Sequence, residues 1–171
     1  MKISVRELVV FAVFAALMFV SKLLMQVLPN IHLLGMFIVA LGVVYRAKAL
    51  LPIYVYVFLD GLFSGFSLWW IPYLYIWSVL WGFVMLLPKN MPIKAQLIVY
   101  PVVSALHGIL FGTLYAPFQA LAFGLNFEGM ISWIIVGLPF DAIHAVSNFA
   151  TGFLIVPLIQ VIRLCENKKT S

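Results

Sequence analysis

Residues 5–28 read VRELVVFAVFAALMFVSKLLMQVL, and this stretch decides the class of the protein. Between Glu7 and Lys22 it contains no charged side chain, and a helix crosses the bilayer core with about 20 apolar residues. Lys2 and Arg6 precede it, so a signal peptide is the alternative interpretation. The apolar run is longer than a signal core and no clear small-residue cleavage site follows, so we expect a retained membrane span.

The composition of the whole chain extends this conclusion. Of 171 residues, 65% are hydrophobic and 9% are charged, whereas soluble domains carry about 25% charged residues. A soluble protein of this length has no interior large enough to bury so much apolar surface. We therefore expect a single transmembrane domain over residues 1–171, with short loops and no soluble catalytic domain.

Six apolar segments follow one another, separated by turn-forming or charged residues. The predicted spans run from Val5 to Leu28, Leu33 to Val44, Ala49 to Ser64, Ile71 to Leu87, Ala95 to Phe123 and Met130 to Leu164. The second span is short, and the last two exceed one straight crossing. Their internal prolines, where kinks or breaks are expected, are Pro101, Pro117, Pro139 and Pro157. The predicted fold class is an all-α integral membrane protein with six transmembrane helices.

The basic residues test this division into spans. With six spans, all the Lys and Arg residues except Lys22 fall on one side of the membrane. These residues are Lys2, Arg6, Arg46, Lys48, Lys89, Lys94, Arg163, Lys168 and Lys169. Because positive charge collects on the cytoplasmic side, both termini are expected in the cytoplasm, across a bacterial plasma membrane. The net charge of +5 then reflects topology in a lipid bilayer and not binding to nucleic acid.

Four ionisable side chains stand out inside the predicted spans. Lys22, Asp60 and Asp141 map to the middle or outer half, so Lys22 is placed to pair with one of the two aspartates. Such groups usually face the protein interior or an aqueous cavity. A structural ion pair and a polar wall for a ligand both remain open. The fourth group, His144, belongs to a longer polar pattern.

Asp141, His144 and Asn148 are spaced by three and four residues, so they share one face of a helix. Ligand binding or hydrogen bonding between helices is favoured for this face over a proton relay. His32 and His107 are isolated in the sequence, and no second motif supplies further metal ligands. We therefore expect neither a metal site nor a cofactor.

Aromatic residues crowd the predicted fourth span. Trp70, Tyr73 and Trp77 form one stripe, which fits either an interfacial aromatic belt or the wall of a cavity that stacks on a planar ring. The fifth span adds further aromatic and polar candidates. The candidate substrate-binding residues are Trp70, Tyr73, Trp77, His107, Tyr115, Gln119, Asp141, His144 and Asn148.

The whole chain resembles the substrate-binding S component of energy-coupling-factor (ECF) transporters. The resemblance rests on six spans with both ends inside, a short second span, and the Ala12-x-x-x-Ala16 motif, whose small residues permit close helix approach. It also rests on Pro139-Phe140-Asp141 with Asn148, and on the ending Val156-Pro157-Leu158. On the residues alone, Ala12 and Ala16 serve internal packing equally well.

The resemblance implies a partnered importer subunit. In this family the alanine motif docks onto a transmembrane T component, which two cytoplasmic ATPases drive, and an outward-facing cavity captures a water-soluble vitamin or related micronutrient. It implies docking through Ala12 and Ala16. The aromatic residues favour a small-molecule substrate with a planar ring.

Two other functional classes stay open. The sequence has neither a Walker A motif nor a nucleophile elbow, so ATP hydrolysis and serine hydrolase chemistry are not expected, and we predict no enzyme activity. A stand-alone proton-coupled carrier would use Asp60, Asp141 and His144, although no two related halves are visible. A small membrane enzyme would use Asp141 and His144 as an acid–base pair but lacks a nucleophile.

Overall fold

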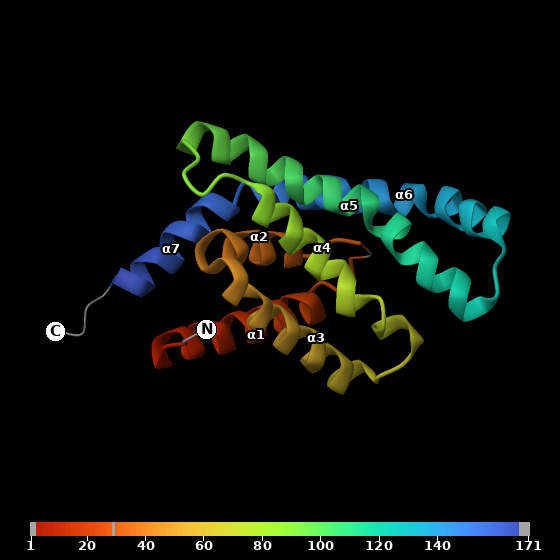
Figure 1. The fold of residues 1–171 in the computed structure, drawn as a ribbon, viewed down its shortest axis with the longest axis horizontal. Helices are drawn as coiled ribbons and strands as arrows, with labels where there is room; N and C mark the ends of the chain where they lie inside the picture. Colours follow the sequence, from red (N-terminus) through yellow and green to blue (C-terminus); the bar gives the residue numbers. More distant parts are fainter. Residues whose placement is uncertain (1–2, 29, 168–171) are drawn as a thin grey trace.

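The computed structural model describes residues 3–28 and 30–167, and every regular element within these ranges is a helix. The α-helices are α1 (Val5–Leu24), α2 (Leu34–Tyr45), α3 (Leu50–Ser64), α4 (Tyr73–Leu86), α5 (Ile93–Phe123), α6 (Phe127–Gly152) and α7 (Ile155–Asn167). Short 3-10 segments, η1 (Arg46–Ala49) and η2 (Leu68–Trp70), precede α3 and α4. Figure 1 shows how these helices are arranged.

Within the described ranges, five segments are long and apolar enough to cross a membrane. They are Val5–Leu24, Leu34–Ser64, Leu68–Leu86, Ile93–Phe123 and Phe127–Gly152. The second of them is two helices, because Arg46 between α2 and α3 has a φ of 53°, outside the helical region. Figure 1 shows α2 and α3 running in different directions. The architecture fits an all-α, multi-pass membrane protein.

The predicted last span, Met130 to Leu164, is broken into two helices, and the break lies just before Pro157, one of the prolines at which a kink or break is expected. Helix α6 ends at Gly152, a turn follows, and α7 begins at Ile155. Pro157 lies in the first turn of α7, where its missing N–H leaves no intrahelical bond unmade. Pro117, in contrast, stays inside α5, which bends in its second half (Figure 1).

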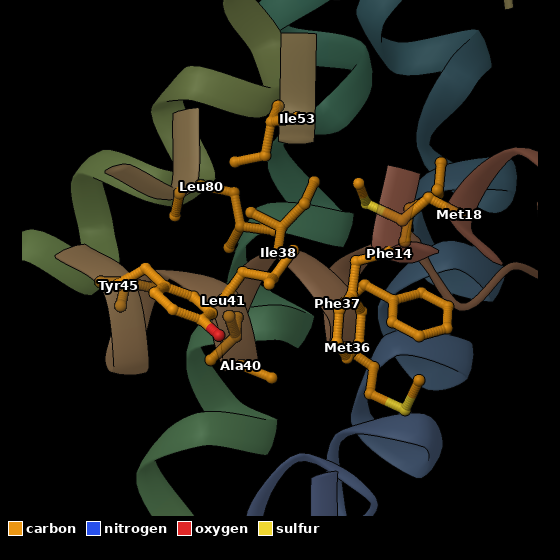
Figure 2. Close-up of a cluster of buried hydrophobic side chains, with 14 of the residues drawn as sticks. Phe14, Met18, Met36, Phe37, Ile38, Ala40, Leu41, Tyr45, Ile53 and Leu80 are labelled. Carbon is orange, nitrogen blue, oxygen red and sulfur yellow. The ribbon is translucent and has the colours of Figure 1, made fainter. Parts of the chain in front are cut away.

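Helix α2 occupies the centre of the bundle. Every residue from Leu34 to Gly42 is buried, and the helix packs against α1, α4, α5, α6 and α7. Figure 2 shows Ile38 beside Leu80 of α4, while Phe37 lies against Phe14 of α1, with ring centroids 6.0 Å apart. A helix without any polar face can be buried all round, which explains its short, uniformly apolar sequence.

Helices α5 and α6 form the closest pair. A Cβ atom at Gly108 would lie 2.8 Å from the backbone nitrogen of Ala145, and one at Gly152 would lie 2.5 Å from Cα of Pro101. Between the helices, Gly124 ends α5 with a φ of 66°, a left-handed conformation that glycine adopts without strain. This hairpin fixes the register between the polar residues of the two helices.

We predict that Gly108→Ala destabilises the protein by about 1–3 kcal/mol, because the new methyl group collides with backbone atoms that cannot rotate away. Thermal unfolding in detergent, followed by circular dichroism, measures the effect. Gly82→Ala is the matched control, since Gly82 is also inside a helix but a Cβ atom there would meet no neighbouring atom within 4 Å. Equal stability of the two variants would contradict the close approach of α5 and α6.

Candidate functional site

A cavity of about 200 Å³, here called the polar cavity, lies at the C-terminal end of α1. Its lining residues are Lys22, Met25, Gln26, Leu28, Asn30, Ile31, His32, Tyr73, Phe111 and His144. Most of them belong to the irregular connection between α1 and α2. Asn30 adopts a φ of 60° there, a conformation that asparagine tolerates better than most residues.

Lys22 supplies a cationic group to the polar cavity. Its ammonium forms an ion pair with Asp60 of α3, which settles which aspartate it contacts. The same nitrogen lies 5.2 Å from the ring centroid of Trp69 and 5.0 Å from that of Tyr73, within the range of cation–π attraction. The side chain of Asp60 is 2% exposed and that of Lys22 is 21% exposed. The ammonium therefore faces the cavity while its counter-charge is buried.

Two histidines meet at the cavity wall. The Nε2 atoms of His32 and His144 are within hydrogen-bond distance, so one ring donates and the other accepts. His32 is isolated in the sequence, and the fold brings it into contact with a residue of α6. Burial, together with the neighbouring His144, lowers the pKa of His32 well below its usual range. Its Nδ1 atom is buried and has no hydrogen-bond partner within the described residues.

Trp77 supports the cavity from behind. Its side chain is 1% exposed, and its ring centroid lies 5.5 Å from that of Tyr73 and 5.8 Å from that of His32. His107 packs against the same ring and donates from Nε2 to the carbonyl of Ile76 at 3.0 Å. These two candidates therefore hold the lining residues in place and do not themselves line the cavity.

A second cavity of about 250 Å³, here called the aromatic slot, adjoins the first. Its lining residues are Asn30, Phe111, Gly112, Tyr115, Trp133, Gly137, Phe140 and Asp141. The rings of Tyr115 and Trp133 are stacked, with centroids 5.9 Å apart. Both carboxylate oxygens of Asp141 accept from the backbone N–H of Gly112, at 3.0 and 3.2 Å. The two cavities share Asn30 and Phe111, so they lie side by side.

The remaining candidates lie elsewhere. Trp70 donates from its indole nitrogen to the carbonyl of Val57 at 2.8 Å, between η2 and α3. Asn148 is fully buried and donates to the carbonyl of Ser104 at 3.2 Å, between α6 and α5. Gln119 is half-buried in α5 and lines neither cavity. In this structure Trp70 and Asn148 join helices to one another.

Sequence reasoning thus found Tyr73 and His144 of the polar cavity, and Tyr115 and Asp141 of the slot. The resemblance to S components implied a cavity near the first loop, but no residue of the connection between α1 and α2 was named, and Phe111 and Trp133 were missed. The available signal in the connection was its cluster of polar residues, which are Gln26, Asn30 and His32. Phe111 lies four residues before Tyr115, on the same face of α5.

No group of three or more His, Cys, Asp or Glu side chains that could hold a metal ion occurs within residues 3–28 and 30–167. Comparisons with protein-family models, curated proteins and solved structures find no match for the chain. The function must therefore be inferred from the geometry of the site.

We predict that Asp60→Asn destabilises the protein by roughly 3 kcal/mol, because the ammonium of Lys22 is left without its counter-charge. Adding Lys22→Met should restore part of the loss, since no uncompensated charge then remains. Chemical unfolding of the two single variants and the double variant gives the coupling energy of the pair. Strictly additive effects would show that the ion pair contributes nothing.

Proposed function

We propose that the protein is the substrate-binding S component of an ECF-type ABC importer, and that it captures a small water-soluble vitamin or related micronutrient. The observation that carries this proposal is the pair of adjacent cavities inside a bundle of membrane-compatible helices. Small-molecule sites are typically apolar hollows with a few convergent polar groups. Here Lys22, the histidine pair and Asp141 are the polar groups, and aromatic rings form most of the remaining wall.

The arrangement of α1 supports a partnered importer. Ala12 and Ala16 are exposed, whereas Phe11, Ala15 and Met18 face the bundle. Two small residues four positions apart leave a smooth stripe on which another transmembrane helix can pack closely. The sequence has no Walker A motif, so energy for import would come from ATPases through a T component docked on this stripe.

The proposal includes cytoplasmic termini and cavities that open outward. Arg6 donates to the carbonyl of Glu166 at 2.8 Å, and Lys48 pairs with Glu7, which brings three segments together at one end of the bundle. Lys89 and Arg163 line one hollow between α5 and α7, and this end lies on the left in Figure 1. Lys2, Lys168 and Lys169 lie outside the described residues. Positive charge of this kind favours the cytoplasmic side.

We predict that cysteines at positions 67 and 128 react with a membrane-impermeant maleimide in intact cells, in a Cys165→Ser background. Ser67 and Glu128 are exposed and lie in or next to loops without Lys or Arg. A cysteine at Asn90, which is also exposed, should react only after the cells are permeabilised. Labelling of position 90 from outside would reverse the proposed orientation.

We predict that Ala12→Trp and Ala16→Trp abolish uptake and co-purification with a T component, while the small molecule bound to the protein is retained. The bulky ring blocks helix docking but lies far along α1 from Lys22. Mass spectrometry of compounds released from purified protein measures retention and identifies the substrate for uptake assays. Val136→Trp, at a 72% exposed position of α6, is the control and should transport normally. Normal uptake by both alanine variants would refute the proposed function.

A further inference from the structure

Asp141 presents a buried carboxylate with no cationic partner among the described residues. The residue is 4% exposed, while the ammonium of Lys22 pairs with Asp60 and that of Lys48 pairs with Glu7. His144, one turn further along α6, directs its Nε2 to His32. A carboxylate inside a membrane bundle is costly unless a positive group or several hydrogen-bond donors compensate it. The one backbone N–H of Gly112 compensates it only in part.

The walls around this carboxylate are aromatic. Tyr115 and Trp133 stand nearly parallel, with 19° between their planes, and Phe111 and Phe140 complete the lining. The face of an aromatic ring carries negative potential and attracts cations. A carboxylate at the edge of such a slot adds a full negative charge to this potential. Both features favour the same kind of ligand group.

The protein contains the same combination a second time, around a cation of its own. Asp60, Trp69 and Tyr73 surround the ammonium of Lys22 with one buried carboxylate, one indole and one phenol. Asp141, Trp133 and Tyr115 supply the same three side-chain types to the aromatic slot. In the first set the protein supplies both the surrounding groups and the cation, which is Lys22. In the second set it supplies only the surrounding groups.

We propose that the aromatic slot binds a positively charged group of the captured ligand, an organic cation such as a quaternary ammonium or a cationic ring. Asp141 supplies the counter-charge, and Tyr115 and Trp133 supply the ring faces. This inference specifies the substrate class of the proposed function and rests on it. The ammonium of Lys22 repels the same group from the polar cavity, so the ligand is oriented with its cationic end in the slot.

If Asp141 had a purely structural role, its hydrogen bond to Gly112 would matter and its negative charge would not. Asparagine would offer a carbonyl oxygen at the same place and keep the hydrogen bond to Gly112, but it would remove the negative charge. Asp141→Asn therefore separates binding of a cation from anchoring of the helix hairpin. Glu128→Gln removes the same charge from an exposed position of the same helix and is the matched control.

The experiment uses the full chain in detergent micelles and three probes that share one benzene ring and differ in charge: benzyltrimethylammonium, benzyl alcohol and benzoate. Calorimetry and tryptophan fluorescence measure binding. We expect saturable binding of the ammonium probe alone, weakened about tenfold by Asp141→Asn and unchanged by Glu128→Gln. Trp133→Leu, at a partly exposed position, should also weaken it and gives a second test if Asp141→Asn unfolds.

Either of two binding results would overturn the assignment: equal binding of the ammonium probe and benzyl alcohol, or unchanged binding of the ammonium probe to well-folded Asp141→Asn or Trp133→Leu. A neutral or anionic compound released from the native protein would also overturn it, while the importer proposal would stand. Conversely, charge-dependent binding at Asp141 combined with normal uptake by Ala12→Trp and Ala16→Trp would refute the importer proposal and leave the slot assignment intact.

Discussion

Burial of α2 on every side organises the rest of the molecule. Lipid tails are as apolar as leucine, so the helices gain little from hydrophobicity alone and must fit one another by shape. Gly35 and Gly42 provide that fit, because a Cβ at these positions would lie 2.6 Å from Oγ of Ser104 and 3.0 Å from a methyl carbon of Val84. The neighbouring helices are thereby set around α2, and the polar cavity forms beside the connection that leads into it.

The class of the fold was predictable from the sequence because composition and charge placement are properties of the chain itself. The length of the last span and its prolines indicated a kink or break, but not its exact place, because the apolar character continues through the turn at Phe153 and Leu154. Gly152 and Pro157 flank that turn, but each residue type also occurs inside helices of this protein. The end of α6 coincides with a close contact to α5, since a Cβ atom at Gly152 would lie 2.5 Å from Cα of Pro101.

The candidate site was predictable where periodicity applies. Tyr73, Tyr115, Asp141 and His144 lie on helices, and their spacing indicated which faces they share. The connection between α1 and α2 has no period, and the contact between His32 and His144 joins residues that are 112 positions apart. Sequence spacing also does not separate a polar side chain that binds a ligand from one that bonds a neighbouring helix, as Asn148 does.

The positive φ at Arg46 places two opposing demands on one position. The backbone geometry suits glycine, yet the guanidinium donates to the carbonyls of Val84 and Met85, at 3.3 and 2.8 Å, in the last turn of α4. Trp81 donates in turn to the carbonyl of Arg46 at 3.0 Å. Glycine at this position would remove the backbone strain but also the hydrogen bonds that cap the end of α4. Most other residues would keep the strain and lose the same hydrogen bonds. Few substitutions are therefore tolerable at this position, although the side chain lies far from either cavity.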